Sequence, residues 1–469
     1  MIVRDQSAPM GARMLRGVIG EFTADVLPRL ERLHEAYTGR GAITRRTRSP
    51  GLPNNKLVHA YPRYIVTMAS GYLVGAPVKY TDDTQVDALK ALEAIHRGSG
   101  IDSVDAELAA DASIYGRGVC VCYTDERGAV KAATLNPREA FVVYDDTVEH
   151  RPLFGVHWMQ RRDEAGKVIG VTAHVHTASE VQTYEGKELS ALRAVSAKAH
   201  LFGGVPMVEF WNNAQEMGDF EPVLSLIEAY DVLESDRVND KQQFTDAVLL
   251  LTGCTLAQEE PIEGEAQDTR SAAQRLLEEK TLSLPDENAK AEWLVKASDE
   301  SGAEMLRNAI KAEIHKMSMI PDLTDEHFAA NASGVAMRYK LFGLEQLTVN
   351  KERWFGEGLR TRLRLFAAMM HVLAKGELDA ERVEISFTRS LPVNETELAA
   401  MVAQLNGLVP HRTLLSRLPF VEDVDKAMDE LDAERREAAQ RQAEAFGGQY
   451  RDEEGEADEA GGAQEDDVP

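Results

Sequence analysis

The sequence predicts an α+β protein built around two long helices. Residues 219–245 and 299–320 carry apolar side chains at intervals of three and four, a pattern typical of helices with one buried face. Between residues 119 and 184, short segments rich in β-branched and aromatic residues are separated by turn residues and predict a mostly antiparallel sheet. Charged helical patterns follow from residue 395. Runs of strands followed by runs of helices are typical of the α+β class.

The chain before the first long helix is expected to combine helices with that sheet. Residues 1–50 predict helices that end in a basic turn, and residues 54–74 predict an amphipathic helix. Two more helices are expected at 88–96 and 104–113. Strands are expected at 78–81, 119–123, 130–135, 137–144, 154–161, 168–176 and 181–184.

The chain after the first long helix is expected to hold short strands and further helices. Strands at 248–251, 281–284 and 291–295 are predicted around a helix at 271–278, and 321–334 is predicted to be a loop. A long helix over 333–349 and 351–374, broken near 348–350 or 356–358, precedes a strand at 383–387. Helices are expected at 395–405, 412–416 and 421–446, and the acidic residues 447–469 are expected to be disordered.

The second half of the first long helix is unusual because residues 235–243 are polar on almost every side. Such a helix usually bridges domains or packs against copies of itself. At about 1.5 Å per residue, the helix would be about 40 Å long. The chain is predicted to leave the body of the protein, form a small module and return as far as Pro321. An ordinary helical hairpin in a globular enzyme remains the alternative.

Composition places the chain among globular proteins of several compact units. Its 469 residues suggest about three such units, and 43% hydrophobic with 28% charged residues is ordinary. We expect no membrane span, because no run of eighteen apolar residues occurs, and no secretory signal. Three cysteines are too few for a disulfide framework, so Cys120, Cys122 and Cys254 are expected to be reduced in a cytosolic assembly environment.

The net charge of −26 is spread unevenly. From residue 447 onward one Arg opposes nine acids, and residues 253–304 carry five bases against thirteen acids. Residues 1–64 carry eleven bases against five acids. Tight binding of a polyanion needs clustered bases, which this distribution does not favour. A surface that repels phosphate would suit a low-friction passage for DNA.

The sequence predicts no catalytic residue, no metal site and no cofactor. It contains no GxxxxGK[ST], HExxH, GxSxG or paired CxxC motif. His157, His174 and His176 are expected on a solvent-facing strand surface, with zinc binding as the less favoured interpretation. Asp145 and Asp146 are expected in a turn that ends a strand, with acid–base catalysis as the less favoured interpretation.

Ten short segments occur in an order that is similar to that of one protein family. They are NNKL at 54–57, YLVGAPVKY at 72–80, YGRG at 115–118, LNPRE at 135–139, VYDD at 143–146, FGGVP at 202–206, EFWNN at 209–213, IPDL at 320–323, NASGVA at 331–336 and LPVN at 391–394. Together they resemble the portal proteins of tailed bacteriophages, of the kind found in long-tailed siphophages. The resemblance extends from about residue 50 to 430, whereas the first fifty residues are distinctive.

The resemblance implies a portal fold and a twelve-fold ring around a DNA channel at one capsid vertex. It implies an α/β wing, long-helix stem, small α/β clip and helical crown. The implied boundaries are wing 1–218, stem helices 219–247 and 299–321, clip 248–298, tunnel loop 322–334, long channel helix and wing return 335–394, crown 395–446 and acidic tail 447–469.

The resemblance also implies a function and partners. The ring would conduct double-stranded DNA in packaging and ejection, and would dock the terminase large subunit and the head–tail adaptor. Further expected partners are the major capsid protein, the scaffolding protein and other copies of this chain. The protein would be a non-enzymatic virion component assembled in the host cytoplasm. A capsid scaffold or adaptor without a channel, and a metal-dependent hydrolase, remain alternatives.

Candidate site residues lie in and around the second long helix. Arg307, Lys311 and His315 are spaced four apart and form a basic stripe on one helix face. The stripe either faces the channel and makes weak phosphate contacts, or forms a salt-bridge face with Glu304 and Glu313. Two other candidate sets are expected, in the tunnel loop and the clip. In the tunnel loop they are Asn331, Ser333 and Gly334, expected beside DNA, with a plain helix–helix connector as the alternative for this loop. In the clip, Trp293 is expected as either a docking anchor or a core residue.

Overall fold

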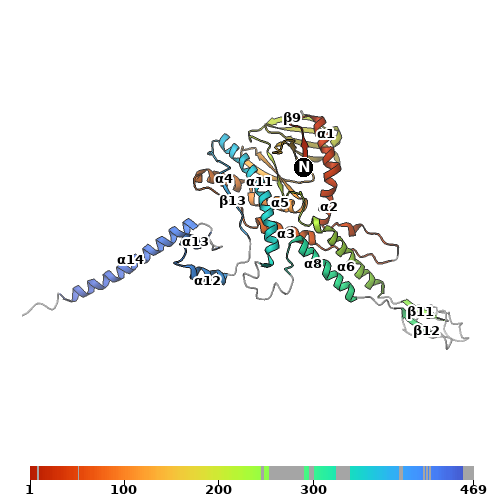
Figure 1. The fold of residues 1–469 in the computed structure, drawn as a ribbon. Coiled ribbons are helices and arrows are strands. Elements are labelled where there is room, and N and C mark those ends of the chain that lie inside the picture. Colours follow the sequence, from red (N-terminus) through yellow and green to blue (C-terminus); the bar gives the residue numbers. More distant parts are fainter. Residues whose placement is uncertain are drawn as a thin grey trace, which may run out of the picture. The chain divides into compact units, whose positions relative to one another are not determined.

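The computed structural model describes the chain over residues 1–7, 10–50, 52–244, 248–252, 290–294, 300–323, 339–389, 395–415, 418, 421 and 424–457. It forms two compact units, fewer than the three that the length suggests (Figure 1). Unit 1 comprises Met1–Asn331 and Met337–Ser390, and unit 2 comprises Ala332–Ala336 and Leu391–Pro469. The fold class is α+β, as predicted.

The largest sheet of unit 1 has six strands in the order β1-β5-β6-β7-β8-β9. The strands are β1 (Ile2–Arg4), β5 (Ala140–Asp145), β6 (Pro152–Arg162), β7 (Val168–His176), β8 (Glu180–Gly186) and β9 (Arg193–Ala199). All neighbours are antiparallel except β1, which runs parallel to β5. The predictions of β5 to β8 are confirmed, whereas β1 and β9 were not predicted.

The N-terminal helices pack on one face of this sheet. They are α1 (Ala12–Glu21), the π-helical turn η1 (Phe22–Val26) and α2 (Leu27–Tyr37). The Phe22 ring stacks on Phe141 at a centroid distance of 4.7 Å and meets the edge of Trp158 at 5.3 Å. Aromatic stacking therefore joins the helices to β5 and β6.

A second sheet, in the order β10-β3-β4, lies next to the main helical core. Its strands are β3 (Arg117–Thr124), β4 (Val130–Leu135) and the unpredicted β10 (Met207–Trp211). The predicted pairing of β3 with β4 is confirmed, and Cys120 and Cys122 are buried free thiols. The helices of this core are α3 (Tyr61–Val74), α4 (Val86–Ser99), α5 (Ile101–Tyr115) and α11 (Phe342–Val372).

Two helix predictions in this core need correction. Helix α3 begins at Tyr61 instead of residue 54, with Pro62 in the first turn, where proline is well tolerated. Helix α11 runs for 31 residues without the predicted break. Gly358 lies inside it because a Cβ there would come within 2.6 Å of the Phe210 ring. Close packing against β10 therefore explains this glycine.

The two long helices are confirmed as α6 (Leu224–Phe244) and α8 (Glu300–Ser318). They pack against each other in Figure 1, and we call this pair the helical hairpin. Between them, β11 (Val248–Thr252) pairs antiparallel with β12 (Lys290–Leu294). The predicted strand at 281–284 and helix at 271–278 lie outside the described residues. A small antiparallel pair, β2 (Lys79–Thr81) with β13 (Glu384–Ser386), completes unit 1.

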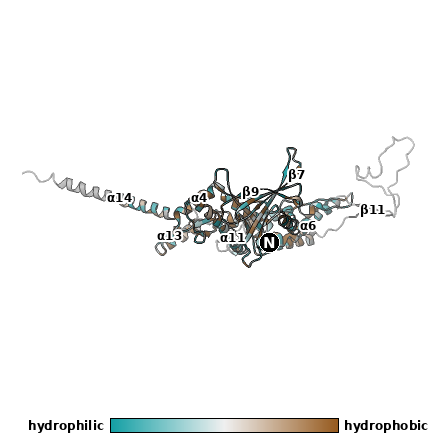
Figure 2. Ribbon diagram, turned by 90° about the horizontal axis from the view of Figure 1, so that it is seen from above, coloured by the Kyte–Doolittle hydropathy of each residue, from teal (hydrophilic) through white to brown (hydrophobic). Residues whose placement is uncertain are grey.

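Unit 2 contains α12 (Glu395–Leu405), α13 (His411–Leu415) and α14 (Val424–Ala457). The coloured part of α14 in Figure 2 is largely hydrophilic. Helix α14 continues through Ala457, so the disorder predicted from residue 447 is wrong for its first eleven positions, and 458–469 lie outside the described residues. Within the described ranges, no helix has the length and apolarity needed to cross a membrane.

A buried ion pair ties α11 to the segment that precedes α6. Lys351 pairs with Asp219, and both side chains are almost fully buried. The Lys351 ammonium also donates a hydrogen bond to Ser113 Oγ at 2.6 Å, and Asn212 donates one to the Asp219 carboxylate at 2.8 Å. Each charge therefore has partners in place of water, which a buried charge requires.

We expect Lys351→Met to lower the free energy of unfolding by about 3–5 kcal/mol, because the Asp219 carboxylate would stay buried without its cation. Urea denaturation at one fixed protein concentration measures this change. The control is Lys90→Met, which breaks an exposed 3.3 Å pair with Asp87 and should cost less than about 1 kcal/mol. An equal loss of unfolding free energy in the two variants would contradict the stabilising role of the buried Lys351–Asp219 pair.

Candidate functional site

The helical hairpin is held together by charged side chains as well as by apolar packing. Arg307 on α8 lies 3.2 Å from the Tyr230 hydroxyl and 3.3 Å from the Glu234 carboxylate on α6. It also pairs with Glu304 at 2.6 Å, and Arg237 reaches the same Glu304 at 3.1 Å. Alternating charges thus connect the two helices. The bond from Arg307 lowers the pKa of Glu304, so this carboxylate is ionised at neutral pH.

The end of α8 is fixed by α3 and by two members of the basic stripe. Lys311 Nζ lies 2.7 Å from the Asp322 carboxylate, and His315 Nδ1 lies 3.0 Å from the Ile320 carbonyl oxygen. Tyr64 on α3 donates a hydrogen bond to the Pro321 carbonyl at 2.7 Å. The chain leaving α8 is therefore anchored just before residues 324–338, which lie outside the described residues.

The three residues of the basic stripe do share one face of α8, and in the protomer this face packs on α6 and α3. Arg307 and Lys311 are partly exposed, whereas His315 is mostly buried, with its ring 5.8 Å from the Tyr61 ring and 5.9 Å from the Tyr64 ring. Carboxylates next to the stripe offset much of its positive charge. Contact between the stripe and DNA stays a prediction.

The other candidate residues fall into two groups. Asn331, Ser333 and Gly334 lie outside the described residues, so their place beside DNA stays a prediction. The backbone of Trp293 lies in β12 opposite Leu249 of β11. Its role as a docking anchor also stays a prediction.

The candidate carboxylate pair at the end of β5 forms a turn, as expected. Asp145 accepts hydrogen bonds from the Thr147 hydroxyl at 2.7 Å and from the Arg151 backbone N–H at 2.9 Å. The Thr147 hydrogen bond lowers the pKa of Asp145, which therefore remains ionised and suits a turn better than proton transfer.

The candidate histidines lie on β6 and β7 and are partly buried instead of solvent-facing. His157 and His174 are cross-strand neighbours with ring centroids 6.5 Å apart. Burial lowers the pKa of His157 to about 4 and that of His176 to about 3, so both rings are neutral near pH 7. Across the described parts of the chain, no group of three His, Cys, Asp or Glu side chains is arranged to hold a metal ion.

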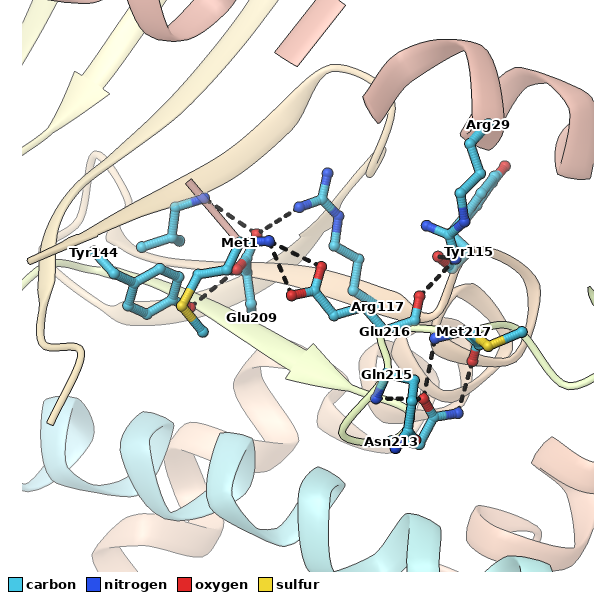
Figure 3. A network of polar contacts seen from close by, with 11 residues as sticks. Met1, Arg29, Tyr115, Arg117, Tyr144, Glu209, Asn213, Gln215, Glu216 and Met217 are labelled. Atoms are coloured by element: carbon cyan, nitrogen blue, oxygen red, sulfur yellow. Dashed lines mark hydrogen bonds and ion pairs between the residues drawn. The ribbon is translucent and has the colours of Figure 1, made fainter. Parts of the chain in front are cut away.

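The segment that leads from β10 into α6 is a tight turn that begins within the EFWNN segment at 209–213. Figure 3 shows Asn213 folded over this turn. Its side-chain oxygen accepts hydrogen bonds from the backbone N–H groups of Gln215 and Met217, and its amide donates to the Met217 carbonyl at 2.8 Å. Asparagine commonly closes turns in this way. The turn sets the direction in which the chain enters α6.

Contacts from α2 and from the chain's N-terminus fix the turn, and Figure 3 shows those made to Glu216. Arg29 of α2 donates a hydrogen bond to the Glu216 carbonyl at 2.6 Å and pairs with Glu221 at 2.7 Å. The Met1 amino group lies 2.9 Å from the Glu216 carboxylate. On β10, the buried Glu209 is hydrogen-bonded to Arg117 and Tyr144. We call residues 212–221 the root of the hairpin.

Backbone contact between the root and the end of α5 explains the YGRG segment. Gly116 has φ +85°, and a Cβ on it would lie 1.9 Å from the Glu216 carbonyl oxygen. A Cβ on Gly218 would lie 2.4 Å from the Ile114 carbonyl oxygen. Glycine at both positions lets the two backbones touch.

Gly116→Ala should destabilise the protomer strongly, because the new methyl group meets backbone that cannot move aside. The control is Gly128→Ala, where φ is +76° and no atom lies within 4 Å of the new methyl group. The control isolates the cost of a left-handed backbone, about 1–2 kcal/mol. Thermal unfolding should show that Gly116→Ala loses at least twice as much unfolding free energy as Gly128→Ala. Equal losses of stability in the two variants would show that the backbone contact with Glu216 does not contribute to stability.

Comparison with known proteins identifies the family. The sequence matches the family described as "Phage portal protein, SPP1 Gp6-like" over residues 22–441. The portal protein of Bacillus phage SPP1 is 23% identical over 422 residues, which cover 83% of this chain and 78% of that protein. The portal protein of Clostridium phage phiCD119 is 23% identical over 398 residues, covering 80% of this chain and 83% of that protein. The chain therefore belongs to the SPP1 Gp6-like family of phage portal proteins, and its α+β fold is the portal fold.

Proposed function

We propose that this chain forms a closed ring, twelve-fold in the capsid, through which double-stranded DNA enters and leaves the phage head. The ring occupies one capsid vertex, and it docks the terminase large subunit during packaging and the head–tail adaptor afterwards. Its role is structural. Membership of the portal family supports this proposal, and the surface of the helical hairpin supports it independently.

Exposed apolar side chains on the outer face of α8 favour a ring. Met305, Leu306 and Met317 are 73%, 51% and 56% exposed, and Val232 on the adjacent α6 is 42% exposed. Leu306 and Met317, eleven residues apart, lie on the same side of α8. Exposed large apolar side chains that lie together mark an interaction site. In a ring, each hairpin has two identical neighbours that can cover these side chains through a heterologous, closing interface.

In this proposal, α6 and α8 are the stem, β11 and β12 belong to the clip, and α12 to α14 belong to the crown. The major capsid protein and scaffolding protein surround the assembled ring, which becomes part of the virion after assembly in the host cytoplasm. The alternative, a capsid scaffold or adaptor without a channel, predicts particles that lack an axial opening.

Replacing Leu306 and Met317 together with Glu should prevent ring formation, because two charges would be buried in the contact between hairpins. Negative-stain electron microscopy and native mass spectrometry should show rings with an axial hole for the unmodified protein and folded single chains for the variant. The control is Asn308→Glu, at an exposed position on the opposite side of the same helix. Normal rings from the double variant would contradict the proposed interface, and unmodified particles without a hole would favour the scaffold.

We further propose that the basic stripe makes weak, sequence-independent contacts with DNA phosphates. Replacing Arg307, Lys311 and His315 with Gln should then slow packaging severalfold in an in vitro assay while rings still form. Lys316→Gln is the matched control for loss of charge on another face of α8. Packaging at the unmodified rate would rule out the contact.

A further inference from the structure

Residues just before α3 are bound along the polar half of α6. Backbone N–H groups of alternate residues in the segment donate hydrogen bonds to α6 side chains that are four residues apart. The pairs are Asn55 to Asn239 Oδ1 at 2.7 Å, Leu57 to Ser235 Oγ at 2.9 Å, and His59 to Asp231 Oδ1 at 2.8 Å. The segment thus runs antiparallel to the helix.

The regularity of these bonds has a geometric cause. Two residues of extended chain span about 6.6 Å, and four residues of α-helix span about 6 Å. One face of a helix can therefore satisfy every second N–H group of an extended strand over a short distance. Asp231, Ser235 and Asn239 are all buried, which a polar side chain tolerates only with such partners.

Side-chain contacts reinforce the docked segment on its N-terminal side. The Asn55 side chain donates hydrogen bonds to Asn239 at 2.9 Å and to Gln242 at 2.8 Å. Further along α6, Asp236 pairs with Arg46 at 2.5 Å and with Arg48. The basic turn noted in the sequence thus places two guanidinium groups on one carboxylate of the hairpin.

The same stretch of chain also reaches the second helix of the hairpin. After Ala60 the chain enters α3, whose Tyr61 and Tyr64 rings contact His315 on α8. Tyr64 additionally holds the Pro321 carbonyl at the end of α8. The stretch from Arg46 to Tyr64 therefore contacts both α6 and α8.

We propose that the described residues 46–50 and 52–59 form a strap that sets the direction of the helical hairpin and can detach from α6 and re-attach. Asp231, Ser235 and Asn239 are its positioning residues. Hydrogen bonds and ion pairs attach the segment to α6, together with the His59 ring, whose centroid lies 4.7 Å from that of Tyr230. Each hydrogen bond contributes only about 0.5–1.5 kcal/mol net, because water can replace it. Apolar packing of α3, α5 and α11 holds the core independently. The strap can therefore open without unfolding the protomer.

The strap is inferred from contacts within one protomer, whereas its role in the ring rests on the proposed function. If DNA passes between the hairpins, their tilt sets the width of the passage, and the strap is the element that fixes this tilt. Its detachment would let the hairpins move while the ring stays closed.

Hydrogen exchange measured by mass spectrometry on the full chain tests the attachment. In Ser235→Ala with Asn239→Ala, peptides covering residues 54–60 should exchange at least tenfold faster, and peptides from α11 should be unchanged. Alanine favours helix, so α6 itself is preserved. Val238→Ala, at an exposed position of the same helix, is the control, and Ser235→Thr should retain protection because it keeps the hydroxyl. Unchanged hydrogen exchange at residues 54–60 in the double variant would contradict the proposal that Ser235 and Asn239 hold the strap on α6.

Packaging assays with the same variants test the positioning role. The double variant should form rings but package DNA at least severalfold more slowly, and Ser235→Thr should package normally. Faster exchange at 54–60 with normal packaging would overturn the positioning role while leaving the attachment intact. If the unmodified protein formed no ring, the proposed function would fail, whereas the exchange result would still decide whether the strap exists.

Discussion

Buried polar groups on α6 must keep hydrogen-bond partners, and this requirement shapes the part of the protomer around the hairpin. An apolar helix face could have packed on any apolar surface of suitable shape. The buried face of α6 instead presents acceptors at a fixed spacing, and only a segment with free N–H groups at a matching spacing satisfies them. A specific docking position follows, because a shifted segment would leave a buried acceptor unpaired.

The root of the hairpin supplies a second, more rigid constraint. There, α5 and the turn before α6 touch through backbone at Gly116 and Gly218, and the buried pair of Lys351 with Asp219 ties the turn to α11. These contacts would have to break before the turn could move relative to α5 and α11. We therefore view the hairpin as fixed at its root and adjustable along its length, where polar bonds hold it.

Much of the fold could be predicted from periodicity, because α6, α8 and strands β3 to β8 each carry a local pattern. The failures have tertiary causes. The unbroken α11 depends on the Phe210 ring filling the space beside Gly358, which no local pattern records. The polar half of α6 predicted a helix that bridges domains or packs against copies of itself. Within the protomer, its buried Ser235 and Asn239 bind Leu57 and Asn55, in a segment that lacks helical or strand periodicity. Contact with other copies stays a prediction. The spacing of Arg307, Lys311 and His315 predicted a shared face, whereas the direction of that face depends on Glu234 and Asp322 elsewhere in the chain.

A cryo-electron microscopy reconstruction of the assembled particle tests the central claim most directly. Our account predicts a closed ring in which α6 and α8 of each chain stand beside those of its neighbours around an axial opening, with Met305, Leu306 and Met317 covered. A particle in which the hairpins remain apart, or lie away from the axis with these side chains exposed, would contradict it.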